Sequence, residues 1–159
     1  MWQPVITFTV PGDPVGKARP RVARRGKHVK LYTPDKTRAY EEKIGWHARS
    51  SHCYLLGPDT PVRVEVIAVF TRPQRLKRAK DPEGLIPHTV KPDLDNVLKS
   101  VLDGLNGVVY PDDKQVCSFD ANGYYAEKEP TPHKGKHHGH SRTWVRVLIH
   151  QPTNTTGSK

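Results

Sequence analysis

Residues 93–107 read DLDNVLKSVLDGLNG, and this stretch decides the fold. Its apolar side chains recur at helical spacing and form one continuous stripe: Leu94, Val97, Leu98, Val101, Leu102 and Leu105. Asn106 and Gly107 are suited to end a helix. The stretch therefore predicts a helix over 94–105 that buries one face against another layer.

Around this helix the chain predicts a single α+β domain over residues 1–151. A second helix is expected over 34–50, where Thr33 and Pro34 suit a helix start and apolar residues recur every four positions. Alternating or apolar runs predict strands, at 5–10, 62–70, 116–126 and 143–150, with a short extended piece at 108–110. We expect a mixed sheet of four or five strands under the two helices, a long hairpin loop over 127–141 and a disordered tail over 152–159.

Composition limits the partners. The chain has 159 residues, the usual size of one domain, and carries a formal net charge of +10. Such a charge favours an anionic partner, either nucleic acid, an anionic membrane or an acidic protein. No secretory signal or membrane-spanning run is seen, so a soluble, intracellular protein is expected. Cys53 and Cys117 are too isolated for a disulfide framework.

Two basic segments are candidates for contact with a phosphate backbone. The first lies in a Gly- and Pro-containing stretch over 16–30 that predicts a loop or an irregular hairpin. The second begins a loop over 72–92. Their candidate DNA-binding residues are Lys17, Arg19, Arg21, Arg24, Arg25, Arg72, Arg75, Lys77 and Arg78. A solvated charged surface is the alternative, but the excess of positive charge favours phosphate contact.

Acidic residues gather at the predicted 94–105 helix. Asp93 and Asp95 lie before and within its first turn, where they could simply cap the helix and interact with its dipole. Asp95, Lys99 and Asp103 share a polar stripe, which alone could be a weak salt-bridge ladder. The sequence leaves both structural explanations open.

Asp112 and Asp113 form a turn that enters the strand over 116–126. Because neighbouring residues of a strand point to opposite faces, only one of the two is expected to join the first acid pair. Five acids around one helix of a basic protein would repel both each other and phosphate. Magnesium would resolve this conflict, since it takes oxygen ligands and bridges carboxylates to phosphates.

Other motifs carry less weight. Residues 12–18 superficially look like a phosphate-binding loop, but the glycine spacing is too short and Ala18 replaces the required Ser or Thr, so no nucleotide cofactor is expected. The histidines of the segment from His133 to His140 lack a nearby cysteine or acid to complete a zinc site. No nucleophile motif of the Gly-x-Ser-x-Gly type is present.

The acidic motifs resemble the RusA family of Holliday junction resolvases of bacteria and their phages. The segments concerned are KPDLDN at 91–96, Lys99 with Asp103, and DDKQV at 112–116. The Pro11-Gly12 turn, the RPR segment at 19–21 and the YTP segment at 32–34 are also similar. The likeness extends over roughly residues 3–150, but the histidine-bearing loop is longer than is usual there.

The resemblance implies a homodimer that nicks opposing strands of a four-way DNA junction with Mg²⁺, or Mn²⁺ as a substitute, in the bacterial cytoplasm. It assigns metal binding and catalysis to Asp93, Asp95 and Asp113, and gives Lys99 an essential role. Asp103 and Asp112 would be supports around the site. The alternatives are a DNA-junction-binding module without catalysis, and a nuclease for simpler branched DNA or RNA.

Overall fold

The computed structural model describes residues 1–128 and 140–151 and contains one five-stranded mixed sheet. The strand order is β1 (Trp2–Pro11), β7 (Arg142–His150), β4 (Val62–Phe70), β6 (Val116–Tyr125) and β5 (Ile86–Pro87). β4 and β6 run parallel, and the other neighbours are antiparallel. The prediction of an α+β fold with a mixed sheet is confirmed.

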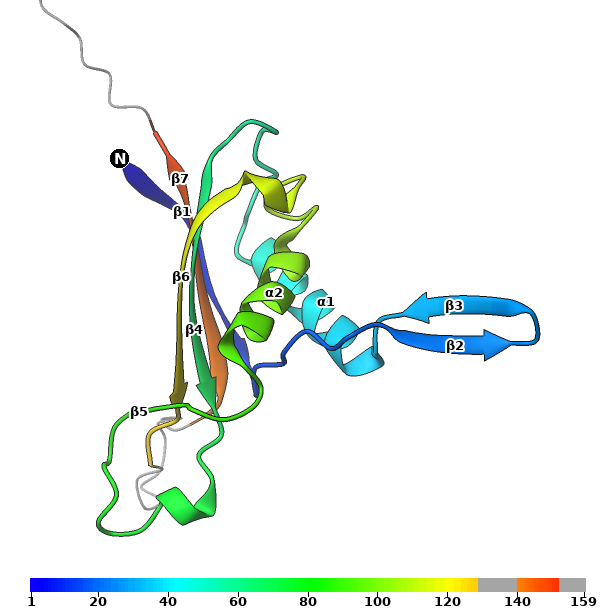
Figure 1. Cartoon of the computed structure of the whole chain (residues 1–159). Coiled ribbons are helices and arrows are strands. Elements are labelled where there is room, and N and C mark those ends of the chain that lie inside the picture. Colours follow the sequence, from blue (N-terminus) through cyan, green and yellow to red (C-terminus); the bar gives the residue numbers. More distant parts are fainter. Residues whose placement is uncertain (129–139, 152–159) are drawn as a thin grey trace, which may run out of the picture.

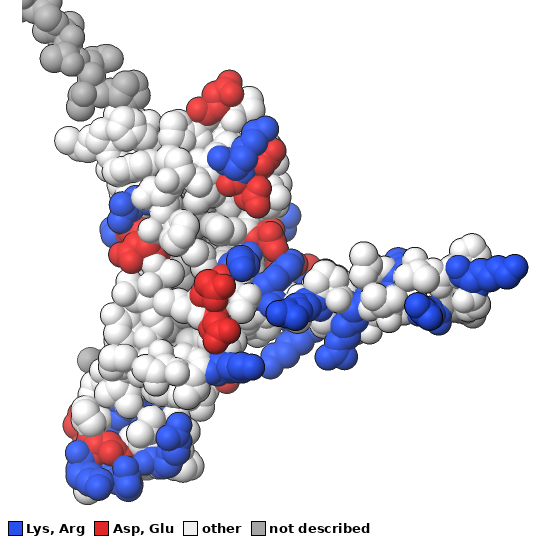
Figure 2. Space-filling view, in the orientation of Figure 1, with Lys and Arg blue, Asp and Glu red and all other residues white. Residues whose placement is uncertain are grey.

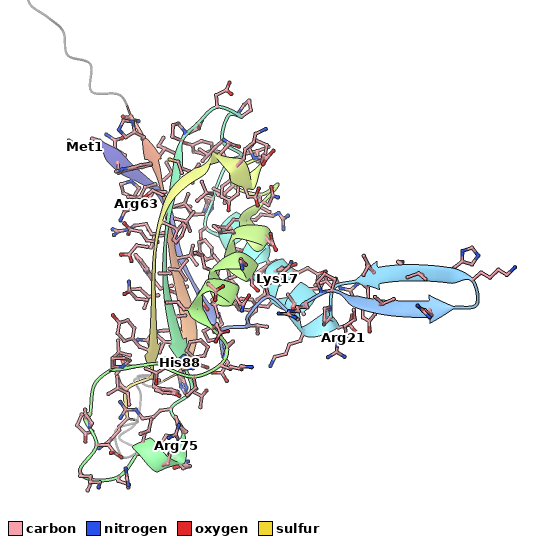
Figure 3. The ribbon with its side chains drawn as sticks, in the orientation of Figure 1. Met1, Lys17, Arg21, Arg63, Arg75 and His88 are labelled. Atoms are coloured by element: carbon pink, nitrogen blue, oxygen red, sulfur yellow. The ribbon has the colours of Figure 1, made fainter. Side chains whose placement is uncertain are left out.

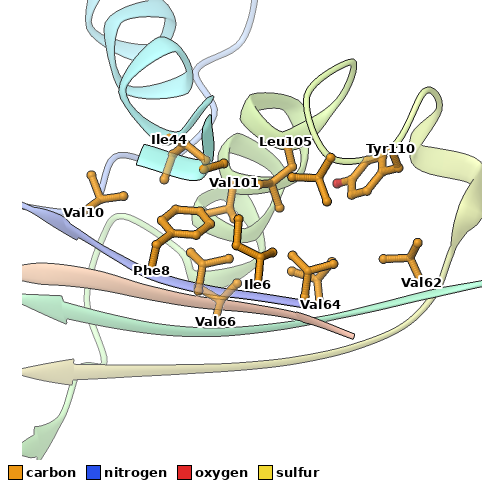
Figure 4. Packing of buried hydrophobic residues seen from close by; sticks show 14 of the residues in the cluster. Ile6, Phe8, Val10, Ile44, Val62, Val64, Val66, Val101, Leu105 and Tyr110 are labelled. Carbon is orange, nitrogen blue, oxygen red and sulfur yellow. The ribbon is translucent and has the colours of Figure 1, made fainter. Parts of the chain in front are cut away.

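Two helices, α1 (Asp35–Ser50) and α2 (Leu94–Leu105), cover one face of this sheet (Figure 1). Alternation along β4 directs Val62, Val64 and Val66 toward the helices, and all three are buried. They meet the apolar faces of the helices, including Ile44 and Val101 (Figure 4). The helix prediction over 94–105 and the strand prediction over 62–70 are confirmed to the residue.

The segment of the chain between β1 and α1 contains a small sheet of its own. β2 (Arg21–Arg25) and β3 (His28–Tyr32) form an antiparallel hairpin that projects from the body (Figure 1). We call residues 21–32 the arm. The predicted loop over 72–92 contains the short 3₁₀ helix η1 (Gln74–Leu76) and β5.

The expected hairpin between the strands at 116–126 and 143–150 is wrong. β4 lies between β6 and β7, so these two strands are not neighbours and the 127–141 segment connects across β4. Hydrophobic alternation identifies a strand but does not identify its neighbours, which explains the error. The predicted extended piece at 108–110 contributes only an isolated bridge from Tyr110 to Asn106. The predicted tail and His133, His137 and His138 lie outside the described residues.

The two helices cross at glycines. A side chain added at Gly104 of α2 would place its Cβ 2.7 Å from both the Glu41 carbonyl oxygen and the Ile44 Cβ of α1. At Gly45 the added Cβ would lie 3.0 Å from the Gly104 carbonyl oxygen. Most of these neighbours are backbone, which cannot move aside without shifting a helix. None of the helices described here is long and apolar enough to cross a membrane.

Replacing Gly104 with alanine is therefore expected to destabilise the fold. Overpacking of this kind costs about 1–3 kcal/mol, although alanine has the better helix propensity. Gly84→Ala is a matched control, because an added Cβ there has no atom within 4 Å. Urea unfolding measures both variants. Equal midpoints for the two would mean that the helices do not cross this closely.

Candidate active site and DNA-facing surface

The two acids at the start of α2 are exposed and are not used as helix caps. Asp93 is the N-cap residue, with an extended backbone at φ −65° and ψ 140°, but its side chain accepts no capping hydrogen bond. Asp95 follows in the first turn, where its side chain is 67% exposed. Both carboxylates lie at the positive end of a helix dipole, which favours negative charge there. Helix capping therefore does not explain Asp93.

Lys99 lies one helical turn after Asp95 and contacts it. The Lys99 Nζ is 3.4 Å from the Asp95 Oδ2, and both side chains are largely exposed. Such an exposed pair contributes little to stability. The ammonium is thus beside the acid pair, yet solvent and ligands can reach it.

Asp103 has a different partner from the one that the polar stripe suggested. Its Oδ2 lies 2.6 Å from the Lys17 Nζ, which also contacts the Glu41 Oε1 at 2.5 Å. Burial alone would lower the pKa of Lys17, but the hydrogen bonds to Asp103 and Glu41 raise it above its usual value. Lys17 therefore links the chain before the arm to α1 and α2. In this conformation its positive charge is paired with the carboxylates of Glu41 and Asp103.

Asp112 and Asp113 lie beyond the other end of α2. Asp112 caps the 3₁₀ helix η2 (Asp113–Gln115), accepting a hydrogen bond of 3.0 Å from the Lys114 backbone. That hydrogen bond is the largest of the effects that lower the pKa of Asp112. Asp113 is exposed. Of the two neighbouring acids, Asp112 has a structural role.

The charges of Asp113 and Asp103 act on the same buried group. Burial raises the pKa of Tyr110, and the charges of Asp113 and Asp103 raise it further. The Tyr110 hydroxyl donates to the Leu102 carbonyl oxygen at 3.0 Å. Asp113 is therefore close to Tyr110, whose hydroxyl contacts the C-terminal part of α2.

The three predicted metal ligands do not meet within one chain. Asp93 and Asp95 lie at the start of α2, whereas Asp113 lies past its end, and a helix of twelve residues is about 18 Å long. Within residues 1–128 and 140–151, no three His, Cys, Asp or Glu side chains are grouped closely enough to hold a metal ion. A three-carboxylate site requires a further contributor.

One edge of β6 is open to such a contributor. β6 pairs with β4 along one side, while on the other side β5 pairs only with Tyr124 and Tyr125. The His88 amide adds one bond to the Gly123 carbonyl oxygen. No described strand pairs with the outer side of residues 116–122, and Phe119 in their middle is 61% exposed. An unpaired strand edge is a ready surface for another chain.

Lys and Arg side chains gather along the arm (Figure 2). The arm contains no Asp or Glu, and its described side chains are all exposed. Register places Lys30 opposite Ala23 and Tyr32 opposite Arg21 on one face. The cations of this arm are Arg21, Arg24, Arg25, Lys27 and Lys30, with exposed Arg19 just before it. A two-stranded ribbon of this kind fits a DNA groove.

The second basic segment divides into exposed and buried residues. Arg72 is only 2% exposed, and its guanidinium donates to the carbonyl oxygens of Pro82 and Gly84. It holds the loop together and is shielded from solvent, so it is not available for a phosphate contact, which corrects that assignment. Arg75 is exposed, whereas exposed Arg78 pairs with Asp81. Lys77 is half-buried.

Two hollows lie beside the chain that leads into α2. The smaller, of about 350 Å³, is lined by Asp93 and Asn96 together with Lys17, Arg19 and Lys91. The larger, of about 670 Å³, lies at the end of β4 and β6, near His88 (Figure 3). Sequence analysis did not identify His88, because a histidine in an irregular loop has no periodic signal. Only the fold brings it to the site.

Comparison with known proteins gives two matches. Residues 11–132 match the sequence model of a family described as Endodeoxyribonuclease RusA. The chain is also similar to the uncharacterized protein YqaN of Bacillus subtilis (strain 168). The two are 34% identical over 132 residues, which cover 77% of this chain and 89% of that protein. Both acidic motifs lie within the family match.

Proposed function

Because the chain belongs to the RusA endodeoxyribonuclease family, we propose that it is a magnesium-dependent nuclease that resolves four-way DNA junctions by paired nicks in opposing strands. The observation that carries this proposal is the pair of exposed carboxylates at Asp93 and Asp95. They are not used as helix caps, and Asp93 lines a hollow together with Lys17, Arg19 and Lys91. Carboxylates on a surface that binds DNA repel the phosphates, unless a bound cation neutralises this repulsion.

In the proposed site Asp93, Asp95 and Asp113 hold Mg²⁺, for which Mn²⁺ can substitute. The donors fit this ion, since all are exposed carboxylate oxygens and Asp93 uses none of them to cap α2. When bound there, Mg²⁺ would supply activation of a water molecule and neutralisation of charge on the phosphate. Lys99 lies next to Asp95 and neutralises negative charge that develops on the cleaved phosphate.

The proposed homodimer completes this site. Antiparallel pairing of the open β6 edges of two copies would have its twofold axis near Phe119. Leu94 of α2 lies close to Gly123, so the start of α2 is near the end of β6. Asp113 lies just before the start of β6. The pairing would therefore bring Asp113 of each copy to Asp93 and Asp95 of the other, giving two sites related by symmetry.

The basic surfaces complete the proposal. Phosphate contacts from the arm and from Arg75 would hold the junction arms and make binding salt dependent. They provide affinity without reading sequence. Selectivity for branched DNA then depends on the dimer, which presents its two sites at a fixed spacing to two strands.

Cleavage of a labelled four-way junction in Mg²⁺ tests the proposal. The native protein is expected to cut two opposing strands, and Asp93→Asn and Asp113→Asn are expected to bind the junction but to cut at least about 100-fold more slowly. Glu42→Gln, which removes an exposed acid from α1, is the matched control and should cut normally.

Other outcomes identify the alternatives. Binding without cuts by the native protein would indicate a junction-binding module. Equal cutting of four-way, three-way and flapped DNA or of RNA would indicate a less selective nuclease. Normal cutting by Asp93→Asn would refute the assignment of the site.

A further inference from the structure

The larger of these two hollows has the size of a ligand pocket. Its volume of about 670 Å³ falls within the roughly 300–1,000 Å³ of small-molecule sites. Its walls come from the segment before the arm, the start of α1, the end of β4 and the chain that leads into α2. We call it the aromatic pocket. The family assignment and the proposed mechanism make no use of it.

Stacked rings form one wall of this pocket. The His88 ring lies against Phe70, with ring centroids 3.8 Å apart and planes inclined by 17°. Tyr125 meets the His88 ring edge-on at 4.8 Å. Phe70 and Tyr125 are buried, and both line the pocket together with His88. Burial lowers the pKa of His88, which favours a neutral ring at neutral pH.

Positive charge surrounds the pocket. Its lining includes Arg21 at the base of the arm, Lys36 in α1, Arg75 in η1 and Lys91 before α2. Figure 3 shows Arg21 at the base of the arm and Arg75 in the loop below His88. The one acid in the lining, Asp13, accepts hydrogen bonds of 2.8 Å from the Thr71 backbone and hydroxyl. A ligand with a flat ring and phosphate groups matches this surface.

The aromatic pocket continues into the smaller hollow that contains Asp93. Both are lined by Gly16, Lys91 and Pro92. Gly16 allows this arrangement, because a Cβ there would lie 3.0 Å from the Pro92 Cβ. A ligand ring in the aromatic pocket would thus have its attached phosphate directed along Lys91 toward the acid pair.

We propose that the aromatic pocket receives one unstacked nucleotide of the DNA strand, next to the phosphate held at Asp93 and Asp95. This inference rests on the proposed function and adds a basis for its selectivity. Removing a base from a duplex costs a few kcal/mol, and the cost is lowest where pairing is already interrupted. A branch point supplies such a base, whereas continuous duplex does not. Stacking on a protein ring offsets this cost, because it strengthens binding by about 5–100-fold per base.

Binding without a metal ion tests this proposal separately from cutting. The probes are three DNA duplexes of equal length: one fully paired, one with a single bulged nucleotide, and one whose bulge is an abasic residue. The native protein is expected to bind the bulged duplex about 5–100-fold more tightly than the paired duplex, in keeping with one stacked base. The abasic bulge should lose most of this preference. Equal binding of the bulged and abasic duplexes would overturn the proposal.

Two pairs of variants locate the preference in this pocket. Val90 lines the pocket and is 48% exposed, so Val90→Asp is expected to fold and to abolish the preference for the bulge. Leu85→Asp changes a residue of similar exposure in the same loop that does not line the pocket, and should keep the preference. His88→Phe should also keep it, whereas His88→Ala should lose it. A preference that survives in Val90→Asp would contradict the assignment.

The two proposals can fail independently. A protein that prefers the bulge but cuts no junction would retain the nucleotide pocket and refute the nuclease function. A protein that cuts junctions without any preference for the bulge would retain the nuclease function and refute the nucleotide pocket.

Discussion

Mixing the Asp95→Asn and Asp113→Asn variants is expected to restore DNA cutting that neither variant has alone. In the proposed dimer each site takes Asp93 and Asp95 from one copy and Asp113 from the other. A mixed dimer then contains one site with both substitutions and one with neither. Half of the dimers in an equimolar mixture are mixed, so about a quarter of the native nicking activity should return.

The products identify the cause of this recovery. A mixed dimer has a single intact site, so it should nick one strand and leave junctions that are not resolved. Mixing Asp93→Asn with Asp95→Asn is the matched control, because these acids come from the same copy and no intact site can form. If the Asp95→Asn and Asp113→Asn mixture stays inactive while its subunits exchange, the shared site is refuted.

Removing the arm is expected to weaken DNA binding by about 100-fold or more at low salt. Replacing residues 21–32 with two glycines removes five cations: Arg21, Arg24, Arg25, Lys27 and Lys30. Each phosphate contact contributes about 0.9 to the slope of log affinity against log salt concentration, so the slope should fall by up to about 4.5. Binding titrations of a four-way junction at several salt concentrations measure both effects.

A second variant separates charge from the loss of the hairpin itself. Arg24, Lys27 and Lys30 are exposed, and changing all three to glutamine keeps the hairpin while the slope should fall by about 2.7. The midpoint of thermal unfolding should change little in either variant, because the described arm side chains are exposed. An unchanged salt slope in the triple variant would show that the arm does not contact phosphate.

The two faces of the arm differ in the number of apolar side chains that they carry. The register pairs Val22 with Leu31. Val29 belongs to the next pair on the same face, and all three side chains are more than half exposed. Arg21 and Lys30 lie on the other face. A hairpin of two strands has little stability of its own in water. Contact with DNA would therefore stabilise the hairpin.

Local periodicity predicted the central parts of this fold. The leucine and valine stripe of α2 and the alternation of β4 each record which side chains face the core, so their bounds follow from the sequence. The position of Asp93 and Lys99 on α2 follows in the same way. These predictions required only the geometry of one element at a time.

Features that depend on the arrangement of elements could not be predicted. Nothing local indicates that β4 separates β6 from β7, that Arg72 turns inward, or that Lys17 binds Asp103. Separation of Asp113 from Asp95 also depends on where the chain goes after α2. The sequence grouped these acids by proximity along the chain, whereas the structure separates them along α2, and for this reason the proposed site includes a second copy.

The strand order has a further consequence for synthesis of the protein. β7 is the last of the described strands along the chain, yet it lies between β1 and β4 and is the strand that joins them. While residues 142–150 are still within the ribosome, β1 has no partner in the sheet. Pairing between residues so far apart in the sequence also makes folding slow. Residues 142–150 should therefore leave the ribosome before the sheet can form, so the basic arm is made and exposed before the fold is complete.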